Sequence, residues 1–355
     1  MRIFLCVLVL AGLACAQELP AAPSAARSGA QQPAAPAATT PADATPAPAP
    51  APEPPKPAPA AAAATAPAND EEIADPGTVI VKRVNEVNVI FTVTDKGGRF
   101  VKGLKQADFT VLDDKKPPQS LVAFRSETNL PIRAALLIDS SNSIRDRFNF
   151  ELEASAEFLS QTIRPKVDKA IVYGFDSTPD PVVENFTDST EQMVSGLRRL
   201  RPGGGTAVWD IVYRISRDKL GKLDEPFAVR RVMVLISDGD DNQSRVSFQE
   251  AMDMAQRAEV IVYAISTNIS GVVSRGDKRL EELAEATGGR VFYPMNLDDI
   301  AEKFVKIQEE LRSQYAVAYK PTDFVADGRY RSIDILASNK KFKVRARKGY
   351  YAPKQ

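Results

Sequence analysis

The pattern of apolar and polar positions divides this chain into segments of different character. From residue 87 to residue 93 every second side chain is apolar, which predicts a half-buried strand. Short apolar runs near residues 109–111 and 121–124 predict further strands, separated by polar turns. We therefore expect an N-terminal β region at 77–128.

Between residues 129 and 313 the pattern alternates between short apolar runs and apolar residues at helical spacing. The predicted strands are 134–138, 170–175, 182–186, 231–237, 260–265 and 291–293. The predicted helices are 144–163, 190–200, 207–220, 248–258, 277–287 and 297–314. Regular alternation of the two is typical of an α/β domain. The prediction for 129–313 is a doubly wound, mostly parallel sheet of the Rossmann-like kind.

After residue 314 the spacing of apolar residues returns to two, which predicts three strands in a C-terminal β region, 314–355. Neither β region is large enough to be stable alone. We therefore expect the two to pair into one split β-sandwich that carries the α/β domain as an insertion. Basic residues alternate along the last predicted strand and its end, which predicts one solvent-facing side: Lys341, Lys343, Arg345 and Arg347.

Residues 1–16 have the pattern of a secretory signal peptide. Arg2 precedes an apolar stretch that is too short to span a bilayer, and Ala14-Cys15-Ala16 forms a small-x-small cleavage site. Lipidation of Cys15 is the alternative. We expect a secreted protein, or one of the periplasm or cell envelope, with no transmembrane segment in the mature chain.

Proline and alanine dominate residues 17–76. Such a composition buries too little apolar surface to offset the conformational entropy lost on folding. The prolines favour extended polyproline II, so this tract is predicted to be a disordered linker that acts as a spacer.

Composition excludes several classes of chemistry. The chain has 46 basic and 46 acidic residues, and this balance argues against a generic nucleic-acid or membrane-surface binder. It has no histidine, which excludes Ser-His-Asp hydrolysis and His-ligated zinc. Both cysteines, Cys6 and Cys15, lie in the predicted signal peptide, so the mature chain has no thiol chemistry.

Polar residues gather where two predicted strands end. Asp139, Ser141 and Ser143 follow the strand at 134–138 in an Asp-x-Ser-x-Ser pattern, and Asp238 follows the strand at 231–237. Thr206 comes after three glycines, just before a predicted helix. Open α/β sheets bind ligands at the carboxyl ends of their strands. Carboxylate and hydroxyl oxygens form a hard ligand set, which suits Mg²⁺ or Mn²⁺.

These five residues together resemble the metal-ion-dependent adhesion site of von Willebrand factor type A domains. The flanking runs Asp108-Phe109-Thr110-Val111 and Lys348-Gly349-Tyr350-Tyr351 resemble the exported family of related domains described from acidobacteria. The resemblance covers about residues 79–352. It implies that Ser141 and Ser143 coordinate the ion directly, that Thr206 binds directly or through water, and that Asp139 and Asp238 act largely through bridging waters. A carboxylate of a protein or peptide partner then completes the coordination.

We therefore expect an extracytoplasmic adhesion module that binds protein and is not an enzyme. An envelope scaffold that uses the domain for self-association is the alternative, and a Mg²⁺-dependent hydrolase is less favoured. Haloacid-dehalogenase-type phosphatases have aspartate at the place of Ser141, and a P-loop needs a lysine before Thr206. Asp240 and Asp241 are candidates for a second cation site or for a solvated acidic loop. Trp209 is expected in the core, with the binding surface as the alternative.

Overall fold

The computed structural model describes residues 86–354 apart from 128–129, 143–144, 146, 269 and 297. The predicted signal peptide and linker therefore lie outside the described residues, as does Ser143 of the predicted metal site. None of the helices in the described part of the chain combines the length and the apolar character needed to cross a bilayer.

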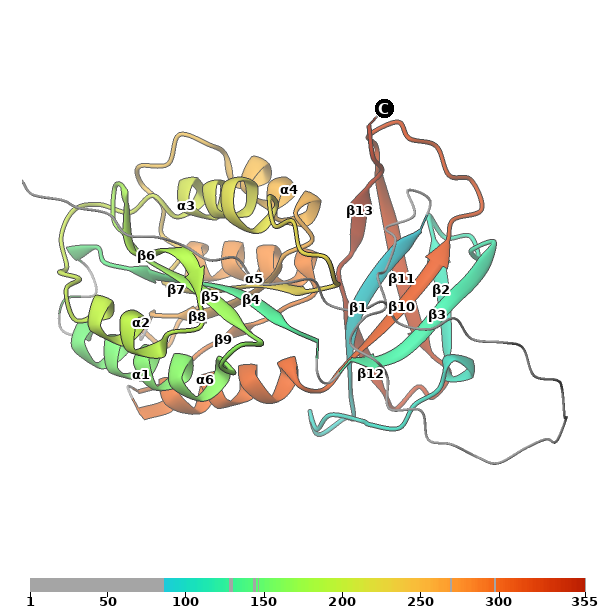
Figure 1. The fold of residues 1–355 in the computed structure, drawn as a ribbon, viewed down its shortest axis with the longest axis horizontal. Coiled ribbons are helices and arrows are strands. Elements are labelled where there is room, and N and C mark those ends of the chain that lie inside the picture. Colours follow the sequence, from blue (N-terminus) through green and yellow to red (C-terminus); the bar gives the residue numbers. More distant parts are fainter. Residues whose placement is uncertain are drawn as a thin grey trace, which may run out of the picture. The chain divides into compact units, whose positions relative to one another are not determined.

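Strands from both flanks of the α/β segment combine into two antiparallel sheets (Figure 1). The first has the order β12-β1-β10-β3, formed by Lys343–Ala346, Val87–Thr94, Gln314–Lys320 and Ser120–Glu127. The second has the order β13-β11-β2, formed by Gly349–Tyr351, Tyr330–Ala337 and Phe109–Asp113. A short 3-10 helix, Gln106–Asp108, precedes β2. Each sheet mixes N-terminal and C-terminal strands, which confirms the split sandwich. Strand β13 was not predicted.

Aromatic side chains fill the space between these two sheets. Phe91 of β1 meets Phe109 of β2 edge-to-face at 5.1 Å and stacks on Tyr315 of β10 at 5.7 Å between ring centroids. The hydroxyls of Tyr319 and Tyr350 both donate to the carboxylate of Asp113, at 2.8 and 3.0 Å. Because these tyrosines belong to different sheets, the shared carboxylate holds the two sheets together.

The α/β segment is built on a six-stranded sheet with the order β6-β5-β4-β7-β8-β9. The strands in that order are Pro179–Thr187, Lys169–Phe175, Ile132–Asp139, Arg230–Ser237, Ile261–Ser266 and Val291–Phe292. All neighbours pair in parallel except β6, which runs antiparallel to β5. The strand order reverses between β4 and β7. Doubly wound sheets bind ligands at such a reversal, outside the carboxyl ends of the strands.

Helices cover both faces of this sheet (Figure 1). Helices α1 (Phe148–Thr162), α2 (Thr190–Leu197) and α6 (Asp298–Leu311) pack on one face. Helices α3, α4 and α5, formed by Val208–Ile215, Phe248–Arg257 and Arg275–Thr287, pack on the other. All eight residues of β4 are buried, as a central parallel strand requires. The helix predicted to reach residue 220 leaves α-geometry after Ile215 and continues as a π-helical turn, Ser216–Leu220.

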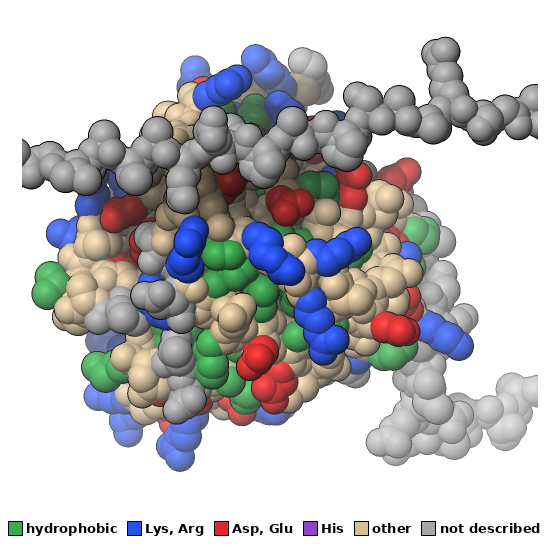
Figure 2. All heavy atoms as spheres, turned by 90° about the vertical axis from the view of Figure 1, so that its left-hand side faces the viewer, with side chains coloured by type: hydrophobic (Ala, Val, Ile, Leu, Met, Phe, Trp, Pro, Cys, Tyr) green, Lys and Arg blue, Asp and Glu red, His purple; other side chains and the backbone are tan. Residues whose placement is uncertain are grey.

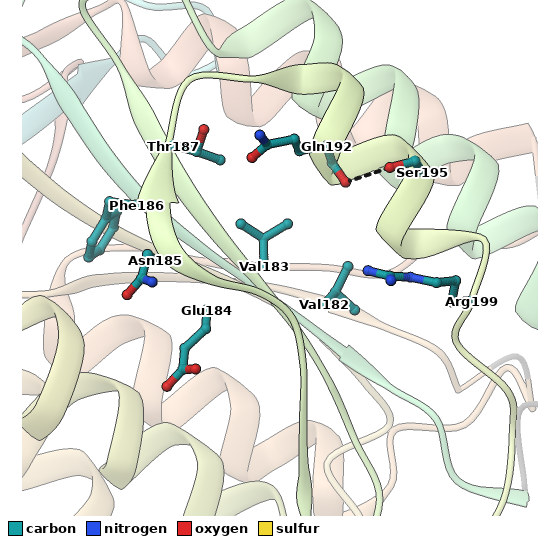
Figure 3. A pocket seen from close by; sticks show the side chains of 9 residues that line it. All are labelled: Val182, Val183, Glu184, Asn185, Phe186, Thr187, Gln192, Ser195 and Arg199. Carbon is teal, nitrogen blue, oxygen red and sulfur yellow. Dashed lines mark hydrogen bonds between the residues drawn. The ribbon is translucent and has the colours of Figure 1, made fainter. Parts of the chain in front are cut away.

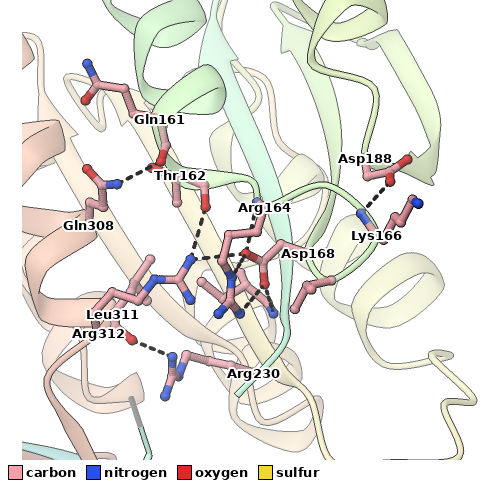
Figure 4. Close-up of polar contacts among 12 residues, drawn as sticks. Gln161, Thr162, Arg164, Lys166, Asp168, Asp188, Arg230, Gln308, Leu311 and Arg312 are labelled. Carbon is pink, nitrogen blue, oxygen red and sulfur yellow. Dashed lines mark hydrogen bonds and ion pairs between the residues drawn. The ribbon is translucent and has the colours of Figure 1, made fainter. Parts of the chain in front are cut away.

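The amino-terminal edge of the sheet is held by paired charges (Figure 4). The carboxylate of Asp168 accepts hydrogen bonds from the backbone N–H of Ile132 at 2.8 Å and from the side chains of Arg164 at 2.7 Å and Arg312 at 3.1 Å. These bonds join the loop after α1, the start of β4 and the end of α6. At this edge the buried carboxylate is therefore paired with two guanidinium groups.

Two arginines of the C-terminal tail contact the α/β segment. The Arg345 guanidinium pairs with Glu310 of α6, which is fully buried. Arg347 donates to the carbonyl of Asn88 at 2.8 Å and to the carboxylate of Glu259 at 3.3 Å. The predicted solvent-facing basic side is therefore wrong for these two residues, because each forms an ion pair with a glutamate of the α/β segment. Lys341 and Lys343 are exposed, as predicted.

Candidate metal centre

The two predicted acidic residues lie side by side at the carboxyl edge of the sheet. Asp139 is the last residue of β4, and Asp238 follows the last residue of β7. These strands are direct neighbours, with Ile138 opposite Ile236. They are also the pair between which the strand order reverses. The sequence rule that polar residues after two adjacent strands converge is therefore confirmed for this pair.

Backbone hydrogen bonds bring the glycine loop onto the Asp-x-Ser segment. The N–H of Gly203 donates to the carbonyl of Ser140 at 2.7 Å, and the N–H of Asn142 donates to the carbonyl of Gly204 at 3.4 Å. Gly204 has φ +72°, which favours glycine. A Cβ at Gly204 would also lie 2.5 Å from the Asp176 carboxylate. The glycines thus allow the loop to approach closely enough to bring Thr206 beside the strand ends.

Asp139 is fully buried and holds two parts of the site in place. Its Oδ1 accepts a hydrogen bond from the N–H of Ser141 at 2.9 Å, and its Oδ2 accepts one from the hydroxyl of Ser237 at 2.7 Å. Burial raises the pKa of Asp139 to about 6, although these hydrogen bonds act in the opposite direction. The carboxylate therefore lacks enough local positive charge to ionise easily.

Asp238 occupies a turn that is pressed against helix α5. Its Oδ1 accepts a hydrogen bond from the N–H of Asp240 at 3.0 Å, and burial raises its pKa above the ordinary range. A Cβ at Gly276 would lie 2.2 Å from the carbonyl oxygen of Asp238, so the two backbones touch. Among the described residues no lysine or arginine forms an ion pair with Asp139 or Asp238.

Backbone hydrogen bonds hold Thr206 against the loop that follows Asp238. Its N–H donates to the side-chain oxygen of Asn242 at 3.1 Å, and its carbonyl accepts from the N–H groups of Asn242 and Gln243 at 3.0 and 3.1 Å. Thr206 is only 5% exposed. A Cβ at Gly205 would lie 2.4 Å from the end of the Gln243 side chain, so Gly205 also lies close to this loop.

The structure thus brings together Asp139, Ser141, Thr206 and Asp238, whereas Ser143 lies outside the described residues. Sequence reasoning missed two residues that support the loops, Asp176 and Asn242. Asp176 directly follows β5 and its carbonyl accepts a hydrogen bond from the N–H of Ala207 at 2.8 Å. The strand-end rule that selected Asp139 would have found it. Asn242 acts through the backbone of Thr206, which leaves no comparable pattern in the sequence.

The acidic loop after Asp238 serves helix α3. The Asp241 carboxylate accepts from the N–H of Trp209 at 3.1 Å and from the hydroxyl of Ser244 at 2.5 Å. That hydroxyl also accepts from the N–H of Asp210 at 3.0 Å. Asp241 therefore satisfies the helix N-terminus, where a negative charge is favourable. Trp209 is 7% exposed and packs edge-to-face on Phe248 at 4.9 Å, which confirms its place in the core.

The donor chemistry at this edge fits a hard divalent cation. The donors are carboxylate and hydroxyl oxygens, and the two carboxylates are desolvated without an ion-pair partner in the described structure. Desolvated carboxylates are stabilised when a cation neutralises them. Asp139, Ser141, Thr206 and Asp238 would hold such an ion, with Ser143 added from the sequence. Within the described ranges no three Asp or Glu side chains form a purely acidic metal cluster.

Figure 2 looks onto this end of the α/β segment. Hydrophobic side chains lie between basic and acidic ones, so the face is mixed in charge. Two cavities lie elsewhere. One of about 390 Å³ lies between β6 and α2 and is lined by residues such as Val183, Gln192 and Arg199 (Figure 3). Another, of about 500 Å³, is lined by residues that include Arg231 and Tyr350. Neither contains a residue of the metal site.

Several solved structures match part of this chain. The PilB minor pilin of Streptococcus sanguinis is 14% identical, with 56% of this chain and 63% of that chain covered at a TM-score of 0.42. Proximal thread matrix protein 1 of the mussel byssus, with a zinc-occupied MIDAS motif, is 17% identical, with 56% and 50% covered at 0.45. A von Willebrand factor type A protein of Catenulispora acidiphila is 11% identical, with 76% and 72% covered at 0.42.

The chain thus spans less than two thirds of the pilin's length. A comparison with curated proteins gives no match. The family model described as von Willebrand factor type A domain matches residues 135–307, a segment that contains the end of β4, all of β7 and all the candidate metal ligands. This chain thus contains a von Willebrand factor type A domain at residues 135–307.

Proposed function

We propose that this protein is an extracytoplasmic binding module in which a divalent cation captures an acidic residue of a partner protein. The observation that carries the proposal is the pair of carboxylates at the reversal point of the sheet: Asp139, which is buried, and Asp238, which is partly buried. Burial is the main cause that raises the pKa values of both carboxylates, so ionising them without a counter-ion is unfavourable. A bound Mg²⁺ or Mn²⁺ is such a counter-ion and attracts a further carboxylate.

The donor set of the chain supports capture of a ligand. Ser141 and Thr206 provide neutral hydroxyls, and Asp139 is already engaged by Ser141 and Ser237. Neutral donors leave a divalent ion under-neutralised, so a partner carboxylate gains a strong charge-assisted contact. The absence of histidine and of thiols from the mature sequence supports a binding role over catalysis. The predicted signal peptide and linker support a position outside the cytoplasm.

Calorimetric titration of Mg²⁺ and Mn²⁺ into the full chain tests the metal site. We expect D139N to bind at least tenfold more weakly than the parent, because it removes the buried carboxylate charge from the site. D180N is the matched control, since Asp180 is exposed at the edge strand β6. The near-ultraviolet signal of buried Trp209 monitors the fold. Equal binding by D139N, or no binding of either ion by the parent, would contradict the proposal.

The partner chemistry is tested with an immobilised chain and paired peptide arrays that differ only in glutamate or glutamine. Capture of the glutamate series with Mn²⁺, and its loss in chelator, is the expected result. Equal capture of both series would show that the carboxylate is not recognised. Association of the chain with itself on Mn²⁺ addition, without peptide capture, would favour the scaffold role.

A further inference from the structure

Glu151 is a buried acid that the proposed metal ligands do not include. It lies in the first turn of α1 and is 0% exposed, and neither of its side-chain oxygens has a hydrogen-bond partner among the described residues. Burying an ionised carboxylate without a partner is strongly unfavourable. Glu153, two residues later on the same helix, is exposed. The burial of Glu151 therefore needs a reason other than packing.

The charges around Glu151 are those of the candidate metal centre. Burial is the main cause that raises the pKa of Glu151 to about 8; Arg147 opposes the shift, and Asp139 and Asp238 add to it. Helices α2 and α6 also pack against α1, and the charged groups that act on Glu151 are Arg147, Asp139 and Asp238. Glu151 thus shares one electrostatic environment with the two carboxylates at the strand ends.

In the described part of the chain, further polar atoms on the surrounding elements are without a partner. Arg147 donates to the backbone carbonyl of Thr267, just beyond β8. The buried hydroxyls of Thr267 and of Ser155, one turn after Glu151 on α1, make no hydrogen bond to a described residue. A satisfied apolar core rarely contains several such groups. Their presence beside Arg147 and Glu151 indicates a polar layer that extends inward from the strand ends.

We propose that Glu151 is the proton-exchanging acid of the metal centre: it holds a proton in the cation-free protein and releases it when a divalent cation binds. This inference rests on the proposed function. With Asp139, Asp238 and Glu151 ionised and Arg147 charged, the cluster carries two net negative charges, which a divalent cation balances. Glu151 is not among the residues that would hold the ion. It acts through the charge that it places behind Asp139 and Asp238.

Protons and cations then compete for this site. A binding event that releases one proton strengthens about tenfold for each unit of pH increase, as long as that proton remains bound in the cation-free form. Glu151 extends such linkage to pH about 8. The chain would therefore respond to pH near neutrality without a histidine.

The test is Mn²⁺ calorimetry with the full chain between pH 7 and 9, in buffers of different ionisation enthalpy that report released protons. We expect E151Q to release fewer protons than the parent at pH 7, to lose most of the pH dependence of its affinity, and to bind at least fivefold more weakly at pH 9. E153Q should match the parent in all three. In chelator, E151Q should also unfold with less dependence on pH between about 4.5 and 8.

The outcomes separate this inference from the proposed function. Mn²⁺ binding with the same proton release by the parent and E151Q would overturn the role of Glu151 and leave the metal site standing. Failure of the parent to bind Mn²⁺ would overturn both. Equal proton loss in E151Q and E153Q would assign the effect to the general charge of α1 and overturn the specific role of Glu151.

Discussion

The two edges of the α/β sheet contain the same kind of residue in opposite electrostatic settings. Asp168 at the amino edge and Asp139 at the carboxyl edge are both 0% exposed. Burial opposes ionisation of Asp168, but hydrogen bonds from Arg164 and the N–H of Ile132 outweigh it, and its pKa lies below the usual range. At Asp139 burial wins and the pKa rises to about 6.

The difference shows that burial alone does not identify a functional acid. At the amino edge two guanidinium groups from distant segments reach one carboxylate, and the result is a closed structural joint. At the carboxyl edge hydroxyls and backbone N–H groups surround the carboxylates without an arginine or lysine ion pair in the described structure. The first arrangement stabilises the fold, and the second favours an external cation.

The largest effect is expected for the loss of Asp168, which should lower the free energy of unfolding. D168A leaves Arg164 and Arg312 without their shared carboxylate and removes the acceptor for the N–H of Ile132. Loss of one partner from a buried charge cluster costs about 3–5 kcal/mol. Urea unfolding of D168A against the parent measures the loss. A cost below about 1 kcal/mol would show that this edge is not the structural joint inferred above.

The next effect concerns the pH dependence of the carboxyl edge. In chelator, the folded protein keeps the Asp139 proton up to pH about 6, whereas the unfolded chain releases it near the ordinary value of 3.8. The stability that the protonated form provides is therefore fully present below pH about 3.8 and is lost as the pH rises through 6. The total is about 3 kcal/mol for a shift of this size.

D139N should remove this dependence, because asparagine does not titrate. Unfolding free energies measured between pH 4 and 7 in chelator test the expectation, with D180N as the exposed control. Asp168 contributes with the opposite sign, since its lowered pKa makes stability fall as the pH falls. A parent and a D139N variant with parallel profiles would remove the contrast between the edges.

The smallest effect concerns the acidic loop beside the metal centre. S244A removes the hydroxyl that accepts from the N–H groups of Trp209 and Asp210 and should cost about 1 kcal/mol, as loss of a helix N-cap does. The same loop is hydrogen-bonded to Thr206 through Asn242 and Gln243, which S244A leaves in place. The variant should therefore weaken Mn²⁺ binding only modestly. Loss of Mn²⁺ binding as severe as in D139N would place this loop among the metal ligands rather than behind them.

The parts that could be predicted from sequence follow from local pattern. Asp139 and Asp238 end apolar runs, and the run of glycines before Thr206 marks a close loop, so each carries its signal in neighbouring residues. The Asp168 joint has no such signal, because Arg312 lies 144 residues away. The solvent-facing position predicted for Arg345 was wrong for the same reason, because its partner Glu310 lies 35 residues away. Strand β13 was missed because three residues are too few to show a period.

The register of the sandwich determines how it carries a mechanical load. The α/β segment joins the sandwich where Glu127 of β3 lies opposite Gln314 of β10. Strand β1 begins at the other end of its ladder with β10, where Val87 lies opposite Tyr319. A pull between residue 86 and the α/β segment therefore slides β1 along β10 in shear. All the backbone hydrogen bonds of that ladder resist together, whereas a peeling force would break them one at a time.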